Sequence, residues 1–78
     1  MIQELLFAAK IMKDNNDWET AQNLYEQALE KNQNDPVVLL SLSEIYSLLG
    51  EKSKAKEMAD RAALYDPQAQ EKTKKWLK

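Results

Sequence analysis

Several residue types on which catalytic and metal sites depend are missing from this 78-residue sequence. It contains no cysteine, which excludes disulfide bonds, thiolate metal sites and a cysteine nucleophile. It contains no histidine, which removes the commonest general base and a common metal ligand. A single glycine leaves no glycine-rich phosphate-binding loop. We therefore expect no enzyme activity, no metal site and no cofactor.

Long apolar runs and a large excess of one charge are also missing. No run approaches the roughly 18 apolar residues of a membrane span, and Gln3, Glu4 and Lys10 interrupt the apolar N-terminal segment, unlike in a signal peptide. The net charge is only −2, and the one basic stretch, EKTKKWLK, is typical of a helix C-terminus. We expect no nucleic-acid partner and no membrane insertion, and a cytoplasmic protein or a soluble fragment of a larger one.

The few helix-breaking residues divide the chain into helical segments. Asn16 and Gly50 are suited to the left-handed conformation that ends a helix. Asp35 and Asp66 each precede a proline, as an N-cap does before the first helical position. Strong helix formers fill the remaining positions, with apolar residues at i, i+3, i+4 and i+7. These signals predict a single domain, residues 1–78, with helices at 2–14, 18–32, 36–49, 52–65 and 67–77.

The sequence also repeats itself with a period of about 34 residues. The repeat aligns the turn residue Asn16 with Gly50, and places two alanines on the second helix of each unit. The aligned identical pairs are Leu5 with Leu39, Ile11 with Ile45, Ala21 with Ala55, and Ala28 with Ala62. A helix–turn–helix unit with this period is the pattern of tetratricopeptide repeats.

The chain therefore resembles the tetratricopeptide repeat (TPR) family. The second unit matches the family best, and the first matches mainly in its second half, DWETAQNLYEQAL. The matching residues are Trp18, Ala21, Tyr25 and Ala28 in the first unit, and Leu42, Tyr46, Gly50, Ala55, Ala62 and Pro67 in the second. Leu39 departs from the family's tryptophan and Ala59 from its aromatic residue. The resemblance implies an all-α fold of two repeats, at about 2–35 and 36–69, stacked as a short right-handed superhelix.

A C-terminal capping helix is expected to follow the second repeat, at about residues 67–77. Ala69, Thr73, Trp76 and Leu77 are spaced to form one stripe on such a helix. That stripe is suited to covering the apolar face that the second repeat leaves open, as the end caps of solenoids do. We therefore assign Trp76 a structural role.

The resemblance further implies a protein–protein interaction scaffold. In the family, the first helices of the repeats line a concave groove that binds a peptide or helix of a partner protein. Mapped by repeat position, this groove comprises Gln3, Leu6, Phe7, Lys10, Lys13, Val37, Leu40, Ser41, Glu44, Ser47 and Leu48. Leu6 and Ser41 stand where the family's carboxylate-binding set requires polar or cationic groups. We therefore expect an apolar partner segment, with an acid to meet Lys10 or Lys13.

Three alternatives to this interpretation remain. Leu6 and Phe7 are also compatible with simple packing against a neighbouring helix or the N-terminus. Because solenoids usually need about three repeats, homodimerisation would stabilise the chain and cover the same apolar residues, so a self-association module fits as well. A fragment or an engineered piece of a longer TPR array fits too.

Overall fold

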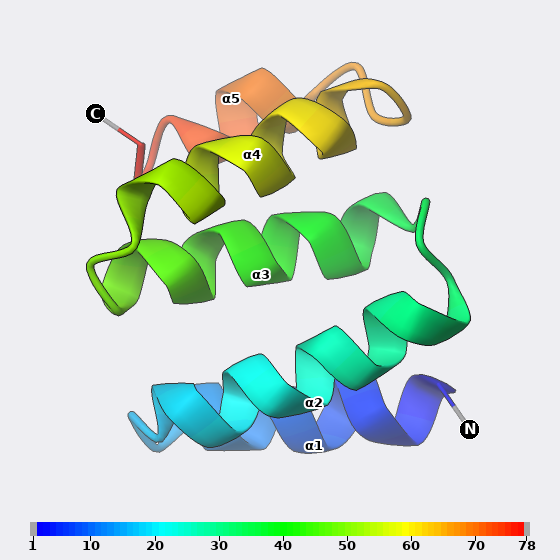
Figure 1. Cartoon of the computed structure of the whole chain (residues 1–78), viewed down its shortest axis with the longest axis vertical. Coiled ribbons are helices and arrows are strands. Elements are labelled where there is room, and N and C mark those ends of the chain that lie inside the picture. Colours follow the sequence, from blue (N-terminus) through cyan, green and yellow to red (C-terminus); the bar gives the residue numbers. More distant parts are fainter. Residues whose placement is uncertain (1, 78) are drawn as a thin grey trace.

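The computed structural model describes residues 2–77, and all its regular elements are helices, which confirms the predicted all-α class. The elements are α1 (Ile2–Asp14), α2 (Trp18–Lys31), α3 (Pro36–Leu48), α4 (Lys52–Ala63) and α5 (Ala69–Thr73). Helices α1 and α2 form a hairpin at one end of the molecule, α3 crosses the middle, and α4 and α5 lie at the other end (Figure 1). Within residues 2–77, none of the helices has the length and apolar character needed to cross a membrane.

The turns inside the two hairpins have the same hydrogen bonds, one repeat apart. Asn16 and Gly50 both adopt positive φ angles, of 65° and 81°, as predicted. The N–H of Asp17 donates to the carbonyl of Met12, and the N–H of Glu51 donates to the carbonyl of Tyr46, each at 2.8 Å. These bonds close the end of the first helix and reverse the chain, so the second helix of each repeat packs back on the first.

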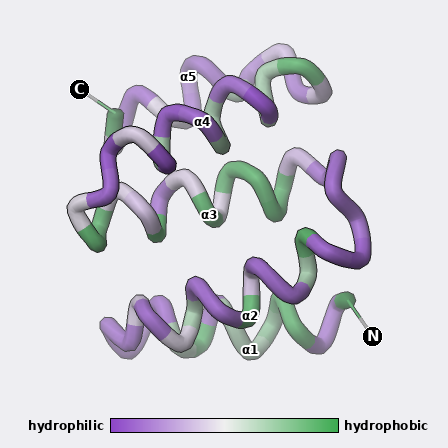
Figure 2. The backbone as a smooth tube through the Cα atoms, in the orientation of Figure 1, coloured by the Kyte–Doolittle hydropathy of each residue, from purple (hydrophilic) through white to green (hydrophobic). Residues whose placement is uncertain are grey.

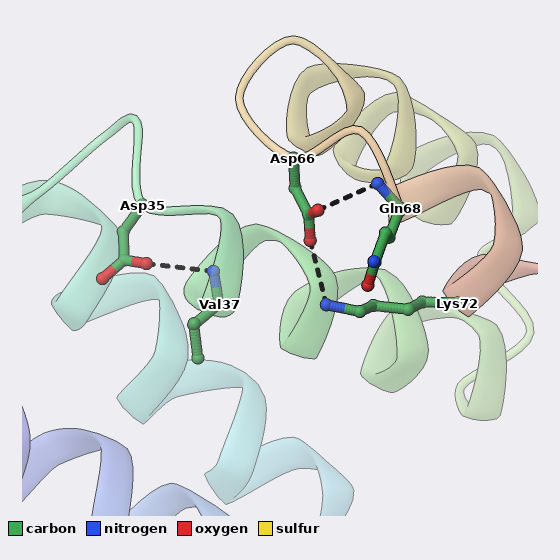
Figure 3. Close-up of polar contacts among 5 residues, drawn as sticks. All are labelled: Asp35, Val37, Asp66, Gln68 and Lys72. Atoms are coloured by element: carbon green, nitrogen blue, oxygen red, sulfur yellow. Dashed lines mark hydrogen bonds and ion pairs between the residues drawn. The ribbon is translucent and has the colours of Figure 1, made fainter.

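The two Asp-Pro sequences also have matching local structures (Figure 3). The Asp35 carboxylate accepts a hydrogen bond from the N–H of Val37, and Asp66 accepts one from the N–H of Gln68, both at 2.9 Å. Asp66 in addition pairs with the ammonium group of Lys72 at 3.0 Å. The Gln68 N–H and Lys72 together hold the pKa of Asp66 below its ordinary value.

Helix α3 is the centre of the core because it packs against α2, α4 and α5. Figure 2 shows long hydrophobic stretches on α3, whereas α4 is mostly hydrophilic. A helix with neighbours on several sides needs apolar residues beyond a single stripe. Its buried residues are Val38, Leu39, Leu42, Ser43, Ile45 and Tyr46.

Alanines form much of the buried face of the two second helices. Ala21 and Ala28 in α2 and Ala55 and Ala62 in α4 are completely buried. Tyr25 is buried between the α2 alanines and fills the space that they leave. Small side chains at these positions let the helices of each hairpin approach closely, so backbone as well as side-chain surface is removed from water.

A tyrosine–glutamate hydrogen bond joins the two repeats. The Tyr46 hydroxyl on α3 donates to Oε2 of Glu26 on α2 at 2.6 Å, and the Gln22 side chain donates to the same oxygen at 3.0 Å. Burial of the phenol and its hydrogen bond to Glu26 raise the pKa of Tyr46 far above its usual range. The bond therefore stabilises the neutral phenol in the folded state.

The C-terminal segment is held on α3 through Trp76. The indole Nε1–H donates to Oγ of Ser43 at 2.8 Å, and Ser43 in turn donates to the carbonyl of Ala55 at 2.8 Å. The hydroxyl of Ser47 donates to the main-chain carbonyl of Trp76 at 3.0 Å. These bonds link α3 to both α4 and the end of the chain, in line with the structural role assigned to Trp76.

Three predicted helix ends were wrong. The capping helix predicted at 67–77 spans only Ala69–Thr73. At its start, residues 67–68 form a turn in which the N–H of Ala69 donates to the carbonyl of Asp66 at 3.0 Å. After Thr73 the chain turns again, and the N–H groups of Trp76 and Leu77 donate to the Thr73 carbonyl at 3.1 and 2.8 Å. The helix predicted at 52–65 ends at Ala63, where Leu64 and Tyr65 make tighter bonds, to carbonyls three residues back, at 3.2 and 3.0 Å.

Enlarging a buried alanine is expected to destabilise the hairpin. Ala28→Leu should lower the free energy of unfolding by about 1–3 kcal/mol, because the added carbons find no space at the helix crossing. Gln27→Leu adds the same side chain at the neighbouring exposed position and should change it by less than about 0.5 kcal/mol. Urea denaturation of both variants measures the difference, and equal effects would contradict the close-packing interpretation.

Tyr46→Phe is expected to change the alkaline stability of the protein. At pH 7 the variant should lose about 1 kcal/mol, the typical net worth of a hydrogen bond. The folded pKa of Tyr46 lies above the unfolded value near 10, so this contribution is complete below pH ~10 and is lost as the pH rises above it. Urea denaturation at pH 7 and 11 should show the gap between wild type and variant shrinking. A constant gap would refute the linkage, since Tyr25 and Tyr65 are common to both proteins.

Candidate partner-binding face

The eleven predicted groove residues lie on α1 and α3, and an ion pair joins the two helices among them. The ammonium group of Lys13 lies 2.5 Å from Oε1 of Glu44, and both side chains are largely buried. Residues three or four positions away on a helix share one face. The pair therefore brings together a row on α1 and a row on α3. We refer to the eleven residues, Gln3, Leu6, Phe7, Lys10, Lys13, Val37, Leu40, Ser41, Glu44, Ser47 and Leu48, as the α1–α3 face.

The apolar residues of this face divide into two groups. Phe7 is 69 % exposed and Val37 is 60 % exposed, and Leu48 is also exposed. Leu6 and Leu40, in contrast, are half-buried and pack against the hydrophobic core. The packing alternative considered above therefore describes Leu6 but not Phe7.

The polar residues of the face are partly engaged within the chain. Lys13 is neutralised by Glu44, whereas Lys10 is exposed and lies 4.0 Å from Asp14. Lys10 is therefore the lysine of this face that is more accessible to a carboxylate of a partner. Gln3 is exposed and Ser41 half-buried.

Ser47 serves the fold rather than an open surface. Its hydroxyl donates to the carbonyl of Trp76, so this end of α3 lies beside the C-terminal segment. Sequence reasoning missed this contact and the Lys13–Glu44 pair. A signal for the first was present, because Ser43 and Ser47 are four residues apart on an apolar helix and so face the same neighbour.

Two hollows in the described part of the chain are lined by residues outside the α1–α3 face. One, of about 450 Å³, lies between α4 and the C-terminal segment, and its walls include Lys56, Ala59 and Trp76. A smaller one, of about 300 Å³, lies between α2 and α4.

The face combines apolar and charged side chains. It offers exposed apolar side chains, an accessible cation and a neutral ion pair between them. Within residues 2–77, no three carboxylates lie together in an arrangement that could hold a metal ion.

Comparison with known proteins gives one match. A family model described as tetratricopeptide repeat matches residues 13–73, which include α2, α3, α4 and α5. The match begins near the end of α1, the helix in which the repeat pattern is weakest. No curated protein and no solved structure matches the chain.

The Lys13–Glu44 pair is expected to couple the two repeats weakly. A double-mutant cycle of Lys13→Met and Glu44→Gln should give a coupling energy of about 0.5–1 kcal/mol, because both side chains are only partly screened by water. The coupling should fall in 1 M salt, where the screening length is only about 3 Å. The exposed pair Lys10 and Asp14 is the matched control and should couple by less. Zero coupling between Lys13 and Glu44 would show that the pair does not join the repeats.

Proposed function

The chain belongs to the tetratricopeptide repeat family, whose members generally act as protein–protein interaction modules, and on this premise we propose that the α1–α3 face binds an apolar segment of a partner protein. Stacked helical repeats present extended surfaces to which partners bind. The first helix of each repeat contributes to the face.

The exposure of Phe7 and Val37 supports this proposal most directly. The core does not need either side chain, because Val38 and Leu39 beside Val37, and Ala9 near Phe7, are completely buried. Phe7 and Val37 leave 69 % and 60 % of their surface in water. Exposed large apolar side chains of this kind are typical of an interaction site, because a partner removes them from water.

The charges of the face favour a segment with a carboxylate near its apolar residues. Lys10 is exposed and its contact to Asp14 is long, so a partner's acid can replace that contact. Lys13 and Glu44 neutralise each other and add no net charge. An apolar segment with an acidic residue one to two turns away would match this arrangement.

Self-association is the second candidate, and one observation favours it. Ile45 on α3 is completely buried, whereas its repeat equivalent Ile11 is 40 % exposed on α1. The position on α1 that corresponds to the buried position of Ile45 on α3 is therefore exposed to solvent. A second copy of the chain would cover it.

Selection of displayed peptides tests the first candidate. Peptides of about 12 residues selected on the wild-type chain should carry apolar residues and an acid. They should bind Phe7→Ser/Val37→Ser at least about tenfold more weakly, because two apolar contacts are worth more than 1.4 kcal/mol. Leu64→Ser/Tyr65→Ser removes exposed apolar residues outside the face and is the matched control. Equal binding to the Phe7/Val37 variant would reject the α1–α3 face as the site.

Sedimentation equilibrium separates the second candidate from the first. If the chain self-associates through α1, the wild type should become heavier with concentration, and Ile11→Ser should shift it toward the monomer. A wild type that remains monomeric to high micromolar concentration would remove this candidate.

A further inference from the structure

We propose that the hollow between α4 and the C-terminal segment is a second docking site, which takes one amphipathic helix of a partner protein. The helix would present small apolar residues to the hollow and acidic residues to its rim. This site is separate from the α1–α3 face, and the inference does not depend on partner binding there.

The hollow has an apolar floor and a charged rim. Ala59 and Thr73 are each only 6 % exposed, and Trp76 and Leu77 are half-buried beside them. The volume of about 450 Å³ is open to solvent, so an elongated ligand can enter it from the side. A floor of this kind favours burial by another apolar surface.

The C-terminal segment begins with the same Asp-Pro cap as α3. This shared cap shows where in the repeat pattern the hollow lies. Asp66 and Pro67 reproduce the cap of Asp35 and Pro36, with the same bond to an N–H two residues on (Figure 3). Helix α5 packs on α4 and α3, much as α3 packs on α2. When the two caps are aligned, Ala69 corresponds to Val38 and is likewise completely buried. Helix α5 therefore takes the place of the first helix of a further repeat.

Within the chain, the corresponding side of α3 is covered by α4. Leu39, Leu42 and Tyr46 are buried along one row of α3. Two contacts place this side under α4, namely the hydrogen bond from Ser43 to the Ala55 carbonyl and the Lys54 ammonium group 5.7 Å from the centre of the Tyr46 ring.

Aligned by the two caps, the row Leu39, Leu42 and Tyr46 corresponds to Gln70, Thr73 and Leu77 in the C-terminal segment. These three residues line the hollow. The hollow is therefore the place that α4 fills one repeat earlier, and within residues 2–77 no helix follows to fill it.

The helix that fills the earlier place shows what fits. Helix α4 packs on α3 with Ala55 and Ala62, both completely buried, so the approach of the two helices is close. By the alignment of the two caps, the floor of the hollow corresponds to the row of α3 that α4 covers. A partner helix therefore needs small residues at the same spacing as those of α4. Large residues would hold it away from Thr73 and Leu77.

The rim selects an acidic helix. Lys52 and Lys56 line the hollow, and neither makes an ion pair with another residue in the range 2–77. Asp60 is the one carboxylate among the lining residues. Two lysines against one aspartate give the rim a positive excess, so acidic side chains beside the small apolar stripe complement it.

A peptide derived from α4 provides the probe. It comprises residues 50–65 of this chain, with Lys52, Lys54 and Lys56 replaced by glutamate, so that it keeps the alanine stripe and gains acidic neighbours. Titrated into the full chain, it should shift the NMR signals of the Trp76 indole N–H and of the Ala59 and Thr73 amides, while those of Phe7 and Val37 stay in place. The peptide with its original lysines is the matched control and should bind at least about tenfold more weakly.

A charge exchange separates docking from a structural effect. Lys52→Glu/Lys56→Glu in the full chain changes two exposed residues, so the fold should persist. This variant should lose about tenfold or more in affinity for the acidic peptide and gain affinity for the lysine peptide.

Three outcomes would overturn the proposal. The first is the absence of shifts at the hollow at about 2 mM peptide, where even a millimolar affinity would be visible. The second is a set of shifts confined to the α1–α3 face, which would assign the peptide to the site of the proposed function instead. The third is a set of shifts at the hollow that follows protein concentration without peptide, which would make a second copy the occupant.

Discussion

The structure depends on the need to cover α3 on several sides at once. Six of its residues are buried, and it contacts α2, α4 and α5, while Val37 and Leu48 stay exposed. Each of the surrounding helices is amphipathic and buries one stripe against a neighbour. The alanine crossings of α2 and α4, the Tyr46–Glu26 bond and the Trp76–Ser43 bond are all ways of closing the surroundings of α3. Helix α5 covers part of α3, and for this reason even so short a helix has a defined position.

Features determined by neighbours in sequence could be predicted from the sequence. The left-handed residues Asn16 and Gly50 and the cap at Asp35 depend on backbone chemistry within a few residues, and each lies where it was expected. The position of the chain after α5 could not be predicted in this way, because distant groups contribute to it. Trp76 is hydrogen-bonded to Ser43 and Ser47 of α3, which lie far from it in the sequence.

The candidate site shows the same division. Repeat position was enough to select helices α1 and α3, and the helical period was enough to select their rows. The period does not determine how far a side chain sinks between two helices, so Leu6 and Leu40 lie partly in the core while Phe7 and Val37 project into solvent. The Lys13–Glu44 pair joins residues of different repeats, and no local rule links them.

The sparse burial of α1 has a further consequence for the protein's dynamics. Ala9 is its only buried residue among those described, whereas α2, α3 and α4 each bury three or more, so of these four helices α1 has the least to lose when it opens. Local opening is easiest where few apolar contacts hold an element, and α1 is therefore expected to exchange its amide hydrogens first. A ligand that contacts Phe7 would slow this exchange, because it binds only the closed helix. Occupancy of the α1–α3 face would then be recorded in the hydrogen-exchange rates of α1, and the affinity of that face would include the free energy of keeping α1 closed.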